Sequence, residues 1–282
     1  MQIKTVGVLG CGLMGAGIAQ VAAASGHRTV VREVNQGLLD KGLGRIRKFL
    51  DGGVTKGKVT AEQRDTTLAN LSGATDFGAL KDCDLVIEAI VEHIDDKIAA
   101  FSALESVVGS GTIFASNTSS LCIMELAART KRPDRFGGLH FFNPVPLMKL
   151  VEVVRALTTS DETYRALYGF AQAVGKEPIT APDKPGFIVN RLLVPYLLDA
   201  IRCYERGLGS VEDIDKGMKL GCGHPMGPLT LLDFVGLDTT YYIANIMFDE
   251  YKDAMFAAPP LLKRMVLAGK LGKKSGEGFY KY

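Results

Sequence analysis

The sequence predicts an α/β protein in which a doubly wound, mostly parallel sheet is followed by an all-helical C-terminal domain. A glycine-rich turn near residue 10 joins an apolar strand to an Ala-rich helix. Apolar strands then alternate with helices as far as residue 182, which is typical of a parallel sheet. Beyond the DKPG segment the pattern is helical, so we expect one domain at residues 1–184 and a second at residues 185–282.

The composition excludes several classes of protein. The chain has 282 residues, 47% of them hydrophobic, which is enough for a large core without metals or disulfides. Its 33 Lys and Arg nearly balance 31 Asp and Glu, so nothing in the total charge points to nucleic acid or to a membrane surface. Five cysteines without metal-ligand spacing favour a reducing compartment and argue against a disulfide framework or a metal site.

No apolar run reaches the roughly 18 residues that a transmembrane helix needs. The first predicted strand begins at Ile3, which leaves no room for a signal or transit peptide. We therefore expect a cytoplasmic protein.

The first predicted strand, KTVGVLG, leads into a G-x-G-x-x-G pattern. Gly10 permits the tight turn, Gly12 lets the backbone approach a pyrophosphate, and Gly15 allows close packing of helix on strand. Leu13 and Met14 lie between the last two glycines and belong to the same candidate cofactor loop. The alternative is a turn of purely structural purpose. Because a strand precedes the loop and a helix follows it, we expect a Rossmann-type dinucleotide site.

Glu33 ends the second predicted strand, 23 positions after Gly10, where an acceptor for a ribose 2′-hydroxyl is expected. Its carboxylate would repel a 2′-phosphate, so NAD is favoured over NADP. The neighbouring Arg32 could serve such a phosphate and keeps NADP open.

Residues 36–72 are predicted to be helical, with a break at Gly52–Gly53 and a capping box formed by Thr60 and Gln63 before the second helix. This region carries a dense basic run: Arg45, Arg47, Lys48, Lys56 and Lys58. Such a run is usually a solvated face, and the alternative is a docking site for a phosphate-rich substrate.

Two apolar strands follow, CDLVIEAI with a helix through Lys97 and Phe101 after it, and GTIFAS. The second strand runs into a cluster of five polar residues: Ser116, Asn117, Thr118, Ser119 and Ser120. Ligands of a doubly wound sheet bind at the carboxyl ends of its strands, so this cluster is a candidate site. Simple helix capping is the alternative.

The segment from His140 to Glu152 is the strongest candidate for chemistry. It is predicted to comprise a strand end, a turn that Pro144 and Pro146 make rigid, and the start of another strand. This layout could bring the imidazole of His140 close to the carboxylate of Glu152, forming an oriented general base. The alternative is a core histidine beside an unrelated glutamate.

A helix from Thr159 to Val174 and a short strand, EPITAP, complete the first domain. The second begins with a long apolar helix over residues 187–207, which contains Pro195 and the polar Asn190. It must be buried by other helices or by a partner subunit. Further helices are expected from Pro228 onward, and His224 is a possible rival base without a carboxylate nearby in sequence.

Six ordered segments together resemble the 3-hydroxyacyl-CoA dehydrogenase family, most of all its bacterial short-chain 3-hydroxybutyryl-CoA form. They are GCGLMGAGIAQ, ASNTSSL, LHFFNPVPLMKLVE, PGFIVNRLLVPYL, MGPLTLLDFVGLD and GKKSGEGFYKY, and they span nearly the whole chain. The resemblance implies a homodimeric enzyme that joins through its C-terminal domain, which also completes the substrate site. It implies NAD-dependent interconversion of (S)-3-hydroxybutyryl-CoA and acetoacetyl-CoA.

The resemblance also implies roles for particular residues. His140 would be the catalytic base and Glu152 its partner, with Ser119 and Asn190 near the reacting oxygen or the thioester. The positions implied to contact the cofactor are Ser119, Asn143, Glu92, Lys97 and Lys274, and Lys56 would meet coenzyme A. Two departures stand out: Glu33 replaces the more usual aspartate, and Gly52 stands where some relatives have a second lysine.

Two rival functions stay open at this point. One is a related dehydrogenase of a free hydroxy acid or sugar acid on the same scaffold. The other is a non-catalytic, NAD-binding structural relative, against which the His140–Glu152 pair argues.

Overall fold

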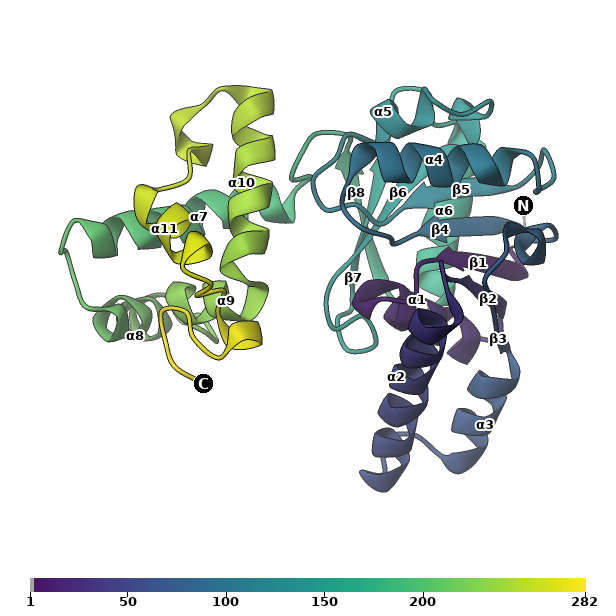
Figure 1. Cartoon of the computed structure of the whole chain (residues 1–282), viewed down its shortest axis with the longest axis horizontal. Coiled ribbons are helices and arrows are strands. Elements are labelled where there is room, and N and C mark those ends of the chain that lie inside the picture. Colours follow the sequence, from purple (N-terminus) through teal and green to yellow (C-terminus); the bar gives the residue numbers. More distant parts are fainter. Residues whose placement is uncertain (1–2) are drawn as a thin grey trace. The chain divides into compact units, whose positions relative to one another are not determined.

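The computed structural model describes residues 3–282. The chain divides into two compact units, Met1–Lys184 and Pro185–Tyr282 (Figure 1). The first contains the sheet, and the second is mainly helical. Within the described residues, no helix combines the length and the hydropathy that are needed to cross a membrane.

The first unit is organised around an eight-stranded sheet with the order β3-β2-β1-β4-β5-β6-β7-β8. Its strands are β1 (Thr5–Leu9), β2 (Arg28–Arg32), β3 (Leu71–Ala74), β4 (Leu85–Glu88), β5 (Ile113–Ser116), β6 (Phe136–Phe141), β7 (Leu150–Arg155) and β8 (Glu177–Pro182). All neighbours are parallel except β6 and β7, which are antiparallel. The strand order reverses between β1 and β4, which is where a doubly wound sheet binds its ligand. The predicted fold class is confirmed.

Six α-helices accompany this sheet: α1 (Leu13–Ala24), α2 (Gln36–Thr55), α3 (Ala61–Ala69), α4 (Ile94–Glu105), α5 (Ile123–Ala127) and α6 (Asp161–Ala173). Helix α1 is buried along most of its length, because its small Ala and Gly residues let it lie close to the strands. Val8, Ile18, Ile87 and Leu139 are fully buried in the core. This packed core fixes the carboxyl ends of β1, β4, β5 and β6, where a ligand site is expected.

The break predicted at Gly52–Gly53 is wrong, because α2 continues through both glycines to Thr55. The helix ends one turn later, where Gly57 adopts φ +66° just after the C-cap Lys56. Only glycine takes this left-handed conformation readily, so Gly57 is the residue that terminates the helix. In Figure 1, α2 and α3 lie side by side.

The end of the predicted helical region is also wrong, because Leu71–Ala74 forms the edge strand β3. This strand pairs in parallel with β2 from Thr29↔Leu71 onward. Its sequence, LSGA, is short and largely exposed, so it lacks the apolar alternation from which a strand is predicted. The capping box at the start of α3 is confirmed, since Thr60 and Gln63 exchange hydrogen bonds.

The second unit packs its helices around its own core. They are α7 (Val189–Glu205), α8 (Val211–Cys222), α9 (Pro228–Val235), α10 (Leu237–Tyr251) and α11 (Pro260–Leu267). Together they form the all-helical C-terminal domain that the sequence predicts. Helix α7 runs on through Pro195, which is buried with Leu197, Leu198 and Ile201. After α11 the chain forms a short 3-10 turn and two isolated β-bridges.

Candidate active site

The glycine loop between β1 and α1 has the geometry of a phosphate-binding turn. Gly10 has φ +91°, and a side chain there would meet the carbonyl oxygen of Ala89. A Cβ on Gly15 would lie 2.0 Å from the carbonyl oxygen of Gly10, so this position admits only glycine. A Cβ on Gly12, by contrast, would meet nothing within 4 Å. Gly10 and Gly15 are therefore required by the fold, whereas Gly12 leaves an open approach to the backbone.

The start of α1 suits an anion. Its N-cap is Gly12, and no side chain caps the helix there. Helices α4 and α5 also lack a cap from the N-cap side chain, whereas α2, α3 and α6 carry caps from Asn35, Thr60 and Ser160. The first N–H groups of a helix have no partner inside it and mark the positive end of its dipole. Together with the open face of Gly12, they fit the pyrophosphate of a dinucleotide.

Glu33 follows β2 and reaches back to this loop. Its carboxylate accepts hydrogen bonds from the backbone N–H of Cys11 at 2.7 Å and of Val34 at 2.7 Å. Burial and the nearby Glu33 raise the pKa of the Cys11 thiol to about 11, so the thiol stays neutral. The guanidinium of Arg32 lies over the ring of Phe77 and donates to Thr75 O. These contacts place a carboxylate beside the loop, as a ribose-binding residue requires.

His140 and Glu152 face each other across the antiparallel pair β6–β7. They are directly opposite in the register, and the distance between His140 Nδ1 and Glu152 Oε2 is 2.7 Å. Glu152 is fully buried and His140 is 4% exposed. A carboxylate at Nδ1 orients the ring and stabilises the imidazolium that forms when the other ring nitrogen takes a proton.

That other nitrogen, His140 Nε2, lies 3.1 Å from the hydroxyl oxygen of Ser119. Ser119 follows β5, and β5 and β6 are parallel neighbours, so both residues lie at the carboxyl edge of the sheet. Glu152, His140 and Ser119 thus form a hydrogen-bonded series that ends at this edge. Proton transfer to or from a substrate oxygen is the chemistry that such a series supports.

A serine, a histidine and a carboxylate in this order also occur in serine hydrolases. A hydrolase needs backbone N–H donors aimed at the oxyanion that forms near its serine. Here the N–H of Ser119 instead donates to the carboxylate of Glu92 at 3.0 Å. A negative charge at this point opposes an oxyanion, so the arrangement favours proton transfer over acyl transfer.

Glu92 receives several hydrogen bonds from the loop after β5. Its Oε1 accepts from the hydroxyl of Thr118, from the N–H of Ser119 and from the hydroxyl of Ser120. On its own, burial would raise the pKa of Glu92, but Lys97 and these hydrogen bonds outweigh it and hold the pKa below its ordinary value. The carboxylate is therefore ionised at neutral pH.

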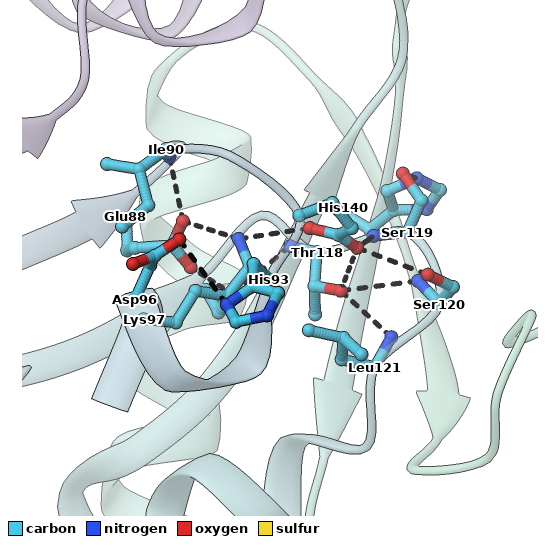
Figure 2. Close-up of polar contacts among 12 residues, drawn as sticks. Glu88, Ile90, His93, Asp96, Lys97, Thr118, Ser119, Ser120, Leu121 and His140 are labelled. Atoms are coloured by element: carbon cyan, nitrogen blue, oxygen red, sulfur yellow. Dashed lines mark hydrogen bonds and ion pairs between the residues drawn. The ribbon is translucent and has the colours of Figure 1, made fainter. Parts of the chain in front are cut away.

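Lys97 is 1% exposed and contacts two carboxylates, Glu88 Oε1 at 2.6 Å and Glu92 Oε2 at 3.0 Å. Figure 2 shows Lys97 beside Glu88. Burial alone would lower its pKa, but the two glutamates raise it above its ordinary value. Glu92 is partly exposed and could meet a cofactor directly. A cofactor contact by Lys97 stays a prediction.

Asn143 is exposed in the turn between β6 and β7, next to the cis peptide bond to Pro144. Lys176, which was not among the predicted site residues, anchors this turn: its buried ammonium donates to Val145 O at 2.5 Å and to Met148 O at 2.8 Å. Burial lowers the pKa of Lys176. Lys176 thus holds the turn at the edge of the sheet where His140 lies.

The remaining predicted residues belong to α2 and to the second unit. Lys56 is exposed at the end of α2, and Gly52 faces open space. In the second unit, Asn190 lies in the first turn of α7, and Lys274 forms an ion pair with Asp238 at 2.6 Å. His224, the rival base, bonds the hydroxyl of Tyr196 at 3.1 Å through Nδ1.

Asn117, from the predicted polar cluster, and Glu88, which was not among the predicted site residues, also shape this edge of the sheet. Asn117 accepts the N–H of Phe141 at 2.9 Å and so holds the end of β6 beside β5. Glu88 ends β4 and is fully buried. A carboxylate at the end of an apolar strand such as DLVIE must find partners when buried, and this is the signal that could have marked Glu88.

Comparisons with known proteins match nearly the whole chain to a single family. The NAD-binding domain profile of the 3-hydroxyacyl-CoA dehydrogenases matches residues 5–184, and the profile of their C-terminal domain matches residues 186–282. A 3-hydroxybutyryl-CoA dehydrogenase of Mycobacterium tuberculosis is 51% identical, over 99% of each chain. The mitochondrial hydroxyacyl-coenzyme A dehydrogenase of Sus scrofa is 50% identical, over 99% of this chain and 91% of its own.

Solved structures give the same result. FadB2 of Mycobacterium tuberculosis superposes with a TM-score of 0.98 at 50% identity, over 100% of both chains. The (S)-3-hydroxybutyryl-CoA dehydrogenase PaaH1 of Ralstonia eutropha superposes with a TM-score of 0.96 at 44% identity, over 100% of this chain and 99% of its own.

Proposed function

The chain belongs to the 3-hydroxyacyl-CoA dehydrogenase family, and from this premise we propose that it interconverts (S)-3-hydroxybutyryl-CoA and acetoacetyl-CoA with NAD. The observation that carries the proposal is the series Glu152–His140–Ser119 at the carboxyl edge of the sheet. The glycine loop that suits a dinucleotide lies at the same edge. Relatives named 3-hydroxybutyryl-CoA dehydrogenase support the choice of acyl chain.

In the oxidative direction, Nε2 of neutral His140 takes the proton of the 3-hydroxyl group. Glu152 stabilises the imidazolium, and the hydroxyl of Ser119 donates a hydrogen bond to the substrate oxygen. A nicotinamide dinucleotide held at the Gly10–Gly15 loop would supply the redox chemistry, as acceptor or donor of the hydride at C3 of the acyl chain. In the reductive direction, His140 returns the proton to the forming alkoxide. Asn190 is the further donor that the family resemblance implies.

The proposal names NAD because Glu33 places a negative charge beside the glycine loop. A 2′-phosphate there would meet this charge, whereas a 2′-hydroxyl could donate to it. Arg32, the residue that could favour NADP, already stacks on Phe77 and bonds Thr75 O. These contacts support NAD as the preferred cofactor.

Two partners complete the proposal. Lys56, exposed at the end of α2 in a basic stretch, is the candidate contact for a coenzyme A phosphate. A second copy of the chain is the candidate partner for the helical unit. There, Leu192 of α7 is 72% exposed and Phe234 of α9 is 50% exposed.

The direct test follows NADH oxidation at 340 nm with acetoacetyl-CoA, and separately with free acetoacetate. We expect turnover with the thioester alone, and Lys56→Ala should raise KM for acetoacetyl-CoA while leaving KM for NADH nearly unchanged. Turnover of free acetoacetate would instead point to a dehydrogenase of hydroxy acids. No hydride transfer with either substrate would indicate a non-catalytic relative.

A further inference from the structure

Glu88 is a fully buried carboxylate whose partners come from three different elements of the first unit. It ends β4, is 0% exposed, and lies opposite Ser116 in the register with β5. Its carboxylate accepts the hydroxyl of Ser116 at 2.6 Å, the N–H of Ile90 at 2.8 Å and the ammonium of Lys97 at 2.6 Å. Strand, loop and helix thus all meet at this one side chain (Figure 2).

Lys97 transmits this fixed position to the neighbouring loop. Its ammonium lies between Glu88 and Glu92, and its side chain is 1% exposed. Glu92 lies in the loop that follows β4, outside any strand, and its side chain is 28% exposed. With Glu88 at the rigid end of β4, Lys97 holds Glu92 to the sheet.

Glu92 in turn holds the residue that contacts the candidate base. Its carboxylate accepts the N–H of Ser119 and the hydroxyls on both sides of it, those of Thr118 and Ser120. The Ser119 hydroxyl, 3.1 Å from His140 Nε2, is therefore positioned from behind by Glu92. The contacts run without a gap from Glu88 to His140.

We propose that Glu88 is a positioning residue for the dehydrogenase reaction, which it serves by fixing Lys97 and Glu92 and thereby the Ser119 hydroxyl at His140. This inference rests on the proposed function and gives Lys97 a role that requires no contact with the cofactor. A second carboxylate is needed because one lysine paired only with Glu92 would move with that loop. Anchoring the lysine to β4 removes this freedom, and a misplacement of about 1 Å at a catalytic group can cost roughly 100-fold in rate.

The test is a double-mutant cycle between Glu88→Gln and Ser119→Ala, with acetoacetyl-CoA and NADH as substrates. We expect Glu88→Gln to lower kcat about 10- to 100-fold while KM for NADH changes less than about threefold. In the Ser119→Ala background, the same change should lower kcat less than about threefold further, because its effect passes through Ser119. The proposal would be overturned if the two losses of kcat multiplied in the double variant, or if either single variant kept the wild-type kcat.

A matched control separates positioning from a general loss of stability. Glu105 pairs with Arg132 at 3.2 Å in the same unit, with side-chain exposures of 11% and 9%, away from the site. Glu105→Gln should lower the unfolding midpoint without lowering kcat. An equal fall of kcat in Glu105→Gln and Glu88→Gln would show that only stability matters, and so overturn the proposal.

A readout that needs no turnover is nitrogen-15 NMR of the imidazole rings, of which the chain has only four. Glu88→Gln and Ser119→Ala should shift the same His140 resonance in the unliganded protein, and Glu105→Gln should leave it unmoved. If Glu88→Gln does not fold, Ser116→Ala removes one donor to Glu88 and keeps every charge. It should shift this resonance and lower kcat in the same direction, and an unchanged resonance would overturn the proposal. If the wild-type chain has no activity, the proposed function is wrong. If the wild type is active and Glu88→Gln has the same kcat, only this inference is wrong.

Discussion

At the scale of single residues, the site depends on pairs that neighbouring strands bring together. His140 and Glu152 are 12 positions apart, and the antiparallel register places them opposite each other. Ser119 is 21 positions from His140 and reaches it from the next parallel strand. His140 and Glu152 are held by their own strands, whereas Ser119 lies in the loop after β5 and its N–H is held by Glu92.

Replacing the base tests this arrangement directly. We expect His140→Gln to lower kcat by roughly 100- to 10,000-fold, the usual contribution of general acid–base catalysis, while NADH binding measured by fluorescence persists. Glu152→Gln should also lower kcat, and the double variant should be little worse than His140→Gln because the two act as a unit. His224→Gln is the control and should keep kcat within a few-fold of wild type. Near-normal activity of His140→Gln would show that His140 is a structural residue of the core and not the catalytic base.

Glu33 tests the choice of cofactor. We expect the wild-type chain to have a higher kcat/KM with NADH than with NADPH, because a 2′-phosphate would meet the Glu33 carboxylate. Glu33→Gln preserves the size of the side chain and removes its charge, so it should reduce this preference about tenfold, or roughly 1.4 kcal/mol. A wild-type chain that uses NADPH as well as NADH contradicts the prediction.

Glu92 should make the stability of the fold depend on pH. Its pKa lies below the ordinary 4.5 in the folded chain, so it stabilises the fold above that value and loses this contribution as pH falls through its folded pKa. Urea unfolding should therefore show wild type more stable than Glu92→Gln at neutral pH. This gap should shrink as pH falls below about 4.5. A gap that is constant down to acid unfolding would show that Glu92 keeps an ordinary pKa.

At the scale of secondary-structure elements, the β1–α1 turn combines two kinds of glycine. Gly10 and Gly15 satisfy the packing of the turn itself, whereas Gly12 keeps space free for a ligand. Glycines also differ in role within α2, where a break was wrongly predicted at Gly52–Gly53. Gly52 and Gly53 adopt helical backbone conformations, and the nearby Gly57, with positive φ, ends the helix.

Two alanine variants separate these roles. Gly12→Ala should fold with a loss of less than about 1 kcal/mol, since only its weaker N-cap preference is affected. It should still weaken NADH binding at least about tenfold, because its methyl group would occupy the approach to the pyrophosphate. Gly15→Ala should cost about 3 kcal/mol or more in unfolding free energy, because its Cβ would clash with backbone. Calorimetry of binding and thermal unfolding measure the two effects, and equal loss of stability in both variants would contradict this division.

At the scale of the whole molecule, each unit has a hydrophobic core of its own. The helical unit nevertheless exposes large apolar side chains on α7 and α9, among them Leu192, Phe234 and Val235. Exposed apolar groups of this size are typical of surfaces that associate. A two-fold contact between identical chains is the simplest arrangement that would cover them.

Sedimentation at micromolar concentration should therefore give twice the chain mass of 30.3 kDa. Leu192→Glu or Phe234→Glu should shift the equilibrium toward monomer, because each would bury a charge in the contact. Leu157, 95% exposed in the first unit, provides the matched control, and Leu157→Glu should stay dimeric. A wild-type chain of monomeric mass would refute the dimer.

The sequence alone determined the fold class and the glycine loop, and it predicted that His140 and Glu152 could meet, because each depends on local patterns: apolar periodicity, glycine spacing and two strands joined by a short turn. Local patterns did not reveal β3, which exists only because β2 offers it an edge. Nor did they reveal the contacts from Glu88 through Lys97 and Glu92 to Ser119, which join β4, α4 and the loop after β5. Such contacts depend on which strands become neighbours, and only the tertiary structure decides that.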